Sequence, residues 1–375
     1  MATSFKTFLN NDITSTKTLL HEAIPITGSI VSGTYGTFPN GGNIKNYAHG
    51  MFQSVYDYPY LSSSANHIFD LTVGYSTGSD SVSASTNTQN AKKVNLYNQM
   101  AQVLQGHNQN GKILRFDQDG NLVESGAGSG TKLDNVVFIN FARLLQKDEI
   151  KKGSFTIKFG AGAPWADPFS GLTEILTIQD TNAENDYRVN SPAGEYGILS
   201  ASAGYNSDFT TAPACGLIFY QAGVAVLSGS IFMSGSAANP LGGVLSSSIS
   251  MSADSTSTTA YTDFAGMLTG SGISASCNEI RHRLYDLSFN NTTELNSTIH
   301  FCRINHNDFN YSANPTYLSS SKIVVKNNSL DAPVSYLTTV GLYSSDNELL
   351  AVAKLSEPLK KDPTNEMTLR VRLDY

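Results

Sequence analysis

Residues 367–375 read MTLRVRLDY, in which apolar and polar side chains alternate without a break. Successive side chains of a β-strand point to opposite faces of the sheet. The apolar positions from Met367 to Tyr375 therefore share one face, and the polar positions from Thr368 to Asp374 share the other. We expect a strand that is buried on one face and that holds this end of the chain in a sheet.

Two more apolar segments, Leu337–Tyr343 and Leu349–Leu355, precede this strand and are separated by the turn-forming residues Ser344–Asn347. Strand-like segments joined by such a turn are typical of a β-hairpin. Proline has no backbone N–H for a neighbouring strand, so Pro358 is expected to end the hairpin. The hairpin and the strand after it are the best-defined candidate for a sheet that faces another subunit.

Short apolar runs also recur between Phe155 and Met267, where Ser, Gly, Ala and Thr fill the connections. This spacing predicts an antiparallel β-domain. Residues 1–88 predict strands and ordered loops, with β-prone stretches at Ile24–Thr34 and His67–Tyr75. The stretch Ser246–Thr259, which is mostly Ser, Thr, Ala and Met, favours a loop over a strand edge. No repeat of fixed period is present, so a solenoid or propeller is not expected.

One amphipathic helix is expected between Gln89 and Gln105. Its apolar positions recur every three or four residues, and Gly106 stands where such a helix would end. A second, shorter helix fits residues 137–146 or 147–152, although the run Val136–Ile139 fits a buried strand equally well. The fold class is therefore mainly β with minor α, with antiparallel, sandwich-like modules and one or two amphipathic helices.

The 375 residues exceed the usual size of one domain. We expect three modules: residues 1–110 with strands, loops and the helix, residues 111–280 as a Ser/Gly-rich antiparallel β-module, and residues 281–375 with the hairpin and the terminal strand.

Composition excludes several classes of function. The net charge of -7 leaves no basic face for a phosphate backbone, so no nucleic-acid partner is expected. The longest apolar stretches fall far short of the roughly 20 residues that cross a bilayer, and charges interrupt the first 20 residues, so neither a membrane span nor a secretion signal is expected. Three widely spaced cysteines (Cys215, Cys277 and Cys302) are expected to be free thiols.

Two polar segments resemble ligand loops only in part. Gly126–Lys132 is glycine-rich but lacks the Gly-Lys-Ser/Thr ending of a phosphate loop, so a flexible turn is favoured. Asp117, Asp119 and Asn121 alternate like the first ligands of a calcium loop. However, Gly120 comes two places early and the closing Glu is absent, so a hairpin turn is favoured.

Two further clusters could be binding sites, but we favour a simpler structural or pairing role for each. On an extended strand, one face would carry the side chains of His300, Cys302 and His306. A fourth metal ligand is missing, however, and His306 lies in a polar stretch. We therefore expect a structural role. Arg281 and Arg283 flank His282 in a basic cluster that could clamp a carboxylate. Pairing with acidic neighbours on another subunit is the favoured role.

No nucleophile elbow, zinc-protease motif, Cys-x-x-Cys pair or poised carboxylate pair is present. We therefore assign no catalytic residue, cofactor or metal, and we expect a protein that is not an enzyme.

Several segments resemble virion structural proteins of contractile-tailed marine phages, the cyanophage-type myoviruses. They are Asn43–Tyr47 with Met51–Pro59, Asp186–Gly197 and Phe289–Thr298. The strand-turn-strand from Val340 to Leu355 is similar to one found in phage tail-fibre and baseplate proteins. Members of such families are described as structural, so the resemblance implies no catalytic residues.

The resemblance implies a virion structural protein, made in the host bacterial cytoplasm and assembled as a tail or baseplate subunit. Its implied partners are other virion structural proteins and further copies of itself. Capsid decoration, a neck or connector role, and a receptor- or glycan-binding module are the alternatives.

Exposed aromatic and arginine side chains are the expected anchors of such interfaces. The candidates in this sequence are Tyr56, Tyr58, Tyr60, Phe309, Tyr311, Tyr317, Tyr343, Arg370, Arg372 and Tyr375. For each tyrosine, packing inside the subunit is an equally good explanation.

Overall fold

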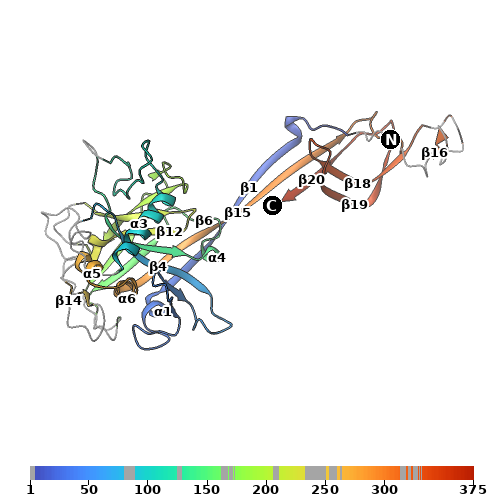
Figure 1. The fold of residues 1–375 in the computed structure, drawn as a ribbon. Helices are drawn as coiled ribbons and strands as arrows, with labels where there is room; N and C mark the ends of the chain where they lie inside the picture. Colours follow the sequence, from blue (N-terminus) through green and yellow to red (C-terminus); the bar gives the residue numbers. More distant parts are fainter. Residues whose placement is uncertain are drawn as a thin grey trace. The chain divides into compact units, whose positions relative to one another are not determined.

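A computed structural model describes residues 5–79, 89–124, 129–161, 168, 172, 174–205, 211–232, 251–252, 260–261, 264–312, 318–319, 322–323, 328, 330 and 332–375. The chain forms two compact units (Figure 1). Unit 1 comprises Met1–Leu20 and Glu294–Tyr375, and unit 2 comprises His21–Thr293. The two boundaries between the three expected modules, near residues 110 and 280, both fall inside unit 2.

The mainly β fold with minor α is confirmed. Strands β1 (Ile13–Thr27) and β15 (Leu284–Ile304) contain residues of both units. In unit 2, the sheet order runs β15-β7-β8-β10-β11-β12-β5-β4-β3-β2. The bounds are β7 Thr156–Ala161, β8 Glu174–Gln179, β10 Tyr196–Ala203, β11 Ala214–Phe219, β12 Val224–Ser228, β5 Asn135–Phe141, β4 His67–Tyr75, β3 Gln53–Tyr56 and β2 Ile44–Asn46.

The ladders between these strands are antiparallel, which confirms the antiparallel β-domain expected between Phe155 and Met267. Four short strands complete unit 2: β6 Glu149–Ile150 pairs with β15, β9 Tyr187–Arg188 pairs with β10, and β13 Met251–Ser252 pairs with β14 Ala260–Tyr261. Apart from β13, most of the Ser/Thr-rich stretch Ser246–Thr259 lies outside the described residues.

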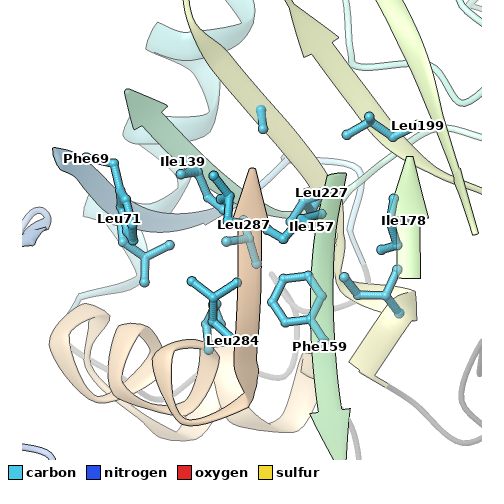
Figure 2. Packing of buried hydrophobic residues seen from close by; sticks show 14 of the residues in the cluster. Phe69, Leu71, Ile139, Ile157, Phe159, Ile178, Leu199, Leu227, Leu284 and Leu287 are labelled. Atoms are coloured by element: carbon cyan, nitrogen blue, oxygen red, sulfur yellow. The ribbon is translucent and has the colours of Figure 1, made fainter. Parts of the chain in front are cut away.

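The central strands of unit 2 are apolar on both faces. In β5, Val136 and Phe138 belong to one hydrophobic cluster, whereas Val137 and Ile139 belong to another. A strand that is buried on both faces reads as a continuous apolar run, so the ambiguous run Val136–Ile139 is a strand. Figure 2 shows the larger cluster, with labelled side chains from β4, β5, β7, β8, β10, β12 and β15.

Helix α3 (Asn90–Leu104) is the helix expected between Gln89 and Gln105. Its residues Tyr97, Ala101 and Leu104 pack in the smaller cluster, and Gly106 follows with a φ of 79°, a conformation that favours glycine. The other described α-helices are α1 Gly28–Ser32, α4 Arg143–Gln146, α5 Phe264–Gly270 and α6 Ile273–Arg283, with 3-10 helices η1 Asn10–Asp12 and η2 Gly229–Phe232.

The basic cluster at Arg281–Arg283 lies on α6 and is buried, so the expected pairing with another subunit is wrong. The Arg281 guanidinium donates hydrogen bonds to the carbonyl oxygens of Val31 (2.6 Å) and Pro39 (2.8 Å) and to the Gln53 side chain (2.8 Å). This arginine therefore holds three distant segments of unit 2 together.

Two further buried ionisable groups lie on these helices. Lys93 of α3 donates to the carbonyl oxygens of Leu268 and Ser271, and burial lowers its pKa to about 8. Burial raises the pKa of Glu279 to about 8, and the neighbouring Arg283, 4.0 Å away, opposes that rise. Neither Glu279 carboxyl oxygen has a hydrogen-bond partner among the described residues. Burial therefore favours the protonated form of Glu279 in the folded protein.

In unit 1, β15 pairs with β1 and with β20 (Met367–Asp374). Burial alternates along β20 as the sequence predicts, with exposed polar residues between half-buried or buried apolar ones. Tyr375 exchanges two backbone hydrogen bonds with Asn296, of 2.9 and 3.1 Å, so the expected attachment of this terminus to a sheet is confirmed.

A separate hairpin consists of β18 (Ser335–Tyr343) and β19 (Leu349–Lys361), as expected between Leu337 and Leu355. However, β19 continues past Pro358. Leu337 pairs with Leu359 while Thr339 pairs with Lys354, so residues 355–358 lie opposite the single residue 338. Proline is tolerated in this bulge, which is why Pro358 does not end the strand. A small strand pair, β16 Leu318–Ser319 and β17 Lys322–Ile323, completes unit 1.

Replacing Glu279 with Gln is expected to change how stability depends on pH. The pKa of this carboxyl is about 8 in the folded protein and about 4.3 in the unfolded chain, so rising pH between these values favours unfolding. In E279Q, this contribution is absent. The free energy of unfolding of E279Q relative to wild type should therefore rise between pH 5 and 8, by at most about 1.4 kcal/mol per pH unit.

Urea unfolding at several pH values measures this difference, and other titrating groups cancel because both proteins share them. Parallel pH profiles for the two proteins would contradict the assignment.

Candidate assembly surface

Apolar side chains are distributed unevenly between the two units. Among the described residues of unit 1, only Ile304, Leu342 and Val371 are buried hydrophobics. Both hydrophobic clusters consist of residues from unit 2. Unit 1 spans 102 residues, and a unit of that size normally orders its chain by burying a sizeable core. The described part of unit 1 therefore leaves uncovered much of the apolar surface that usually stabilises a fold.

The exposed side chains of unit 1 include one face of the hairpin in the part near its turn. Cross-strand partners lie on the same face of a sheet, and Thr339 pairs with Lys354, Gly341 with Val352, and Tyr343 with Leu349. We call these six residues the hairpin face, and all six are exposed. Leu349 retains 53% of its accessible surface, Val352 50% and Tyr343 45%.

The absence of a side chain at Gly341 shapes this face. A Cβ atom at Gly341 would lie 2.9 Å from the Tyr343 ring and 3.3 Å from Leu349 Cδ1. Both side chains therefore lie over the glycine. Phe5 extends the apolar surface, since its ring packs edge-on against Tyr343 at 4.9 Å between centroids.

Strands β15, β18 and β20 also border a cavity of about 540 Å³ in unit 1. Its apolar lining includes Phe8, Cys302, Leu342 and Leu369, and Asp12 and Arg303 contribute an ion pair at 2.6 Å. Such a space between strands is consistent with the small number of buried side chains in this unit.

A buried lysine anchors the base of the hairpin. Lys361, the last residue of β19, is fully buried. Its ammonium group donates to the carbonyl oxygens of His306 (3.1 Å) and Asp362 (2.7 Å) and to the Asn310 side chain (2.6 Å). These charge-assisted bonds fix the hairpin to the turn that follows β15.

The sheet of unit 1 ends in strands without a second neighbour among the described residues. β1 and β20 each pair with β15 alone. In β1, the side chains from Ile13 to Ala23 are all exposed. Unpaired strand edges and exposed apolar faces are surfaces to which other chains can bind.

The predicted interface residues fall into both units. In unit 1, Phe309, Tyr311, Tyr343 and Tyr375 are exposed, as are the β20 arginines Arg370 and Arg372. Arg372 is bonded to Asp374 (2.7 Å) and Ser297 (3.0 Å). Their part in an interface stays a prediction, and Tyr317 lies outside the described residues.

The other three candidates belong to unit 2. Tyr58 and Tyr60 are exposed, whereas Tyr56 is half-buried, with its ring centroid 5.5 Å from that of His67. The same region holds further aromatic pairs, namely Tyr35 with Tyr58 and Tyr47 with His49.

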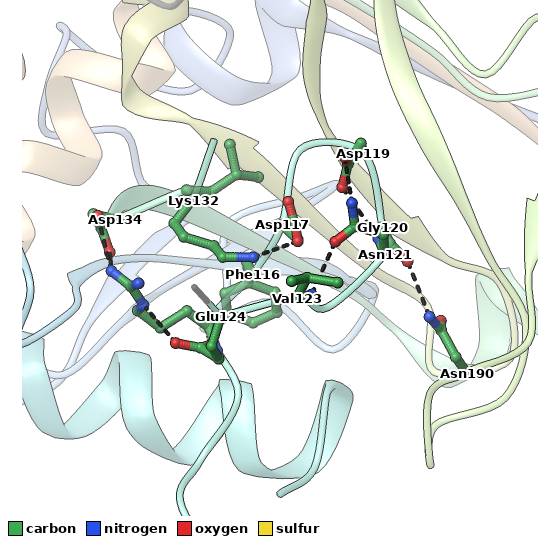
Figure 3. A network of polar contacts seen from close by, with 12 residues as sticks. Phe116, Asp117, Asp119, Gly120, Asn121, Val123, Glu124, Lys132, Asp134 and Asn190 are labelled. Atoms are coloured by element: carbon green, nitrogen blue, oxygen red, sulfur yellow. Dashed lines mark hydrogen bonds and ion pairs between the residues drawn. The ribbon is translucent and has the colours of Figure 1, made fainter. Parts of the chain in front are cut away.

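The segment with alternating Asp117, Asp119 and Asn121 is a turn. Figure 3 shows Asp117 paired with Lys132, which faces it in an antiparallel bridge, and both side chains are buried. The Asn121 backbone N–H donates to the Asp119 carboxylate at 3.1 Å, as in other Asx turns. Burial raises the pKa of Asp117, and the Lys132 ammonium opposes that rise. Of the glycine-rich loop Gly126–Lys132, residues 126–128 lie outside the described residues.

His300 and Cys302 lie on β15, and the His300 ring packs against Phe8 at 5.3 Å. His306 lies beyond the strand, where its carbonyl oxygen accepts the Lys361 bond. In the part of the chain that the structure describes, no three His, Cys, Asp or Glu side chains are placed to hold a metal. The three cysteines are unpaired thiols, as expected.

The sequence analysis did not propose Leu349 and Val352 as interface residues, although the run of apolar residues around them could have indicated it. The run Leu349–Ala353 is apolar at consecutive positions, which is typical of a strand covered on both faces. In this structure, Leu349, Leu350 and Val352 of this run are exposed.

Comparisons of the chain with protein-family models, curated proteins and solved structures give no match. None of the described helices has the length and apolar character that a membrane span requires.

Replacing Lys361 with Met is expected to loosen the hairpin without disturbing unit 2. The substitution leaves the carbonyl oxygens of His306 and Asp362 without their donor, at a cost of about 2 kcal/mol. Hydrogen exchange should therefore accelerate in β18 and β19 and stay unchanged in β5 and β12. The neighbouring Lys360, an exposed residue paired with Asp362 at 3.4 Å, supplies the control K360M, for which little change is expected. Equal effects of the two substitutions would contradict the anchoring role.

Proposed function

We propose that this protein is a non-enzymatic structural protein of a bacteriophage particle and that it is a tail or baseplate subunit. It acts through protein–protein interfaces in which unit 1 takes part. The observation that carries the proposal is the exposed apolar surface of unit 1, of which the hairpin face is the clearest part.

The physical argument concerns the cost of ordering the chain. Fixing the backbone costs about 1–2 kcal/mol per residue, and apolar burial supplies most of the compensation. Unit 2 buries two hydrophobic clusters, whereas the described part of unit 1 buries three hydrophobic side chains. Contact with neighbouring subunits supplies the missing burial in proteins whose folded state depends on assembly.

The segment resemblances to virion proteins of cyanophage-type myoviruses support the assignment to a phage particle. The strand-turn-strand similar to tail-fibre and baseplate proteins corresponds to β18 and β19, the hairpin with the exposed face. We therefore place the tail or baseplate ahead of capsid decoration and of a neck or connector role.

The buried charges support a structural role over a catalytic one. Arg281, Lys93 and Lys361 each bind backbone carbonyl groups and so hold segments of the fold together.

A second candidate function is binding of cell-surface glycans by unit 2. The observation that favours it is the aromatic group formed by Tyr35, Tyr47, Tyr58 and Tyr60, with Lys45 4.8 Å from the centre of the Tyr47 ring. Aromatic rings beside polar groups are common in binding sites, because the rings stack on a ligand and the polar groups orient it.

The leading proposal is tested on purified particles of the phage that encodes the chain. Quantitative mass spectrometry should find the protein in several copies per particle, and it should remain after a high-salt wash. Immunogold labelling should place it on the tail or baseplate. Absence of the protein from purified particles would rule out every structural role.

The glycan proposal is tested with the purified protein and polysaccharide from the host cell envelope. Binding should weaken about tenfold in Y58A, because the loss of one aromatic ring from a contact costs on the order of 1 kcal/mol. Tyr187, an exposed tyrosine of unit 2 outside the aromatic group, supplies the control Y187A. Equal affinity of wild type and Y58A would count against the glycan site.

A further inference from the structure

We propose that the partner of the hairpin face is the hairpin face of a second copy of this chain, packed against it in antiparallel orientation. This inference rests on the proposed function, since it names the first partner of the surface that carries that function.

The chemistry of the hairpin face suits a second copy. Its centre is apolar, with Tyr343, Leu349 and Val352 exposed side by side around Gly341. An apolar centre with a polar rim is the usual composition of a protein interface. Two identical apolar faces are complementary without any matching of charge, because the hydrophobic effect is not directional.

Net charge opposes self-association through unit 2 but not through unit 1. Unit 1 contains ten Lys and Arg residues and ten Asp and Glu residues, so it is neutral. Unit 2 contains 14 Lys and Arg against 21 Asp and Glu, and therefore holds the entire net charge of -7. Two copies repel each other through unit 2, whereas no net repulsion opposes contact through unit 1.

The hairpin also has charges at defined places along its length. Asp346 and Glu348 lie at the turn, and Lys354 lies on the hairpin face six residues after Glu348. None of these three side chains forms an ion pair with the residues described in unit 1. A parallel pair of hairpins would place the two acidic turns together, which is unfavourable.

An antiparallel pair places Glu348 of each copy near Lys354 of the other. A two-fold axis halfway between these residues passes beside Ala351, next to the cross-strand pair Gly341 and Val352. Such an interface uses the same patch on both subunits, and Val352 lies at its centre. The ion pairs then fix the orientation, while the apolar centre supplies the affinity.

The need of unit 1 for a partner also favours a second copy over another protein. A unit that buries so few apolar side chains needs its partner while it folds. A second copy of the same chain is available at that time, because it is produced in equal amounts. Closed two-fold dimers are the commonest protein oligomers.

The proposal is tested on the full-length protein by sedimentation equilibrium over a range of concentrations. Wild type should form a dimer. V352E should weaken dimerisation at least about tenfold, because it places two like carboxylates at the centre of an apolar interface. Val189 is an exposed valine of unit 2, at 71% of its accessible surface, and V189E is the matched control that should dimerise like wild type.

The orientation is tested by exchanging charges. E348K and K354E should each weaken dimerisation about two- to fivefold, and the double variant should return to within about twofold of wild type.

Hydrogen exchange in β5 and β12 should stay unchanged in every variant, which separates lost association from lost folding. A monomer at all concentrations, a trimer, equal behaviour of V352E and V189E, or failure of the double variant to recover would each overturn the proposal. These outcomes leave the proposed function standing if the protein is found in particles. Absence from particles would remove that function even if the dimer forms.

Discussion

Burial of apolar side chains on both faces of β5 and β12 is the interaction on which unit 2 depends. Alternate residues of each strand enter different hydrophobic clusters, so these two strands join helix α3 to the rest of the core. Such burial offsets the entropy lost by a long chain with many connecting loops. Unit 1 has no equivalent of these strands among its described residues. Unit 2 therefore obtains its apolar contacts within the chain, whereas the described part of unit 1 makes few of them.

Buried cations connect segments that the strands do not. Arg281 holds the carbonyl groups of Val31 and Pro39, and Lys361 holds that of His306. A buried cation is favourable only where several acceptors surround it, so each of these residues specifies one arrangement of the loops around it. In both units, the loops are thus ordered by polar contacts where apolar contacts are few.

Local patterns predicted local structure well. The alternation in Met367–Tyr375 and the turn residues between β18 and β19 each depend on neighbours in the sequence, and both elements were predicted. The burial of Arg281 was missed, because its acceptors lie more than 200 residues away and a charged triplet is usually exposed. The sequence also did not predict that unit 1 combines Met1–Leu20 with Glu294–Tyr375. This combination depends on the pairing of β1 with β15, and no local pattern links segments so far apart.

For the candidate site, the aromatic anchors could be proposed from residue type alone. The exposure of Leu349 and Val352 could not, because it depends on what the rest of the chain leaves uncovered.

The bulge at residues 355–358 bears on how large an assembly can grow. A regular strand edge offers an unbroken row of N–H and C=O groups, to which identical strands can add without limit to form filaments. In β19, four residues lie opposite one, and Pro358 among them has no N–H to offer. Continuous edge-to-edge growth along this strand is therefore interrupted, whereas a face that pairs with its own copy is used up by a single contact. If the hairpin face pairs with its own copy as proposed, the hairpin therefore favours an assembly of fixed size.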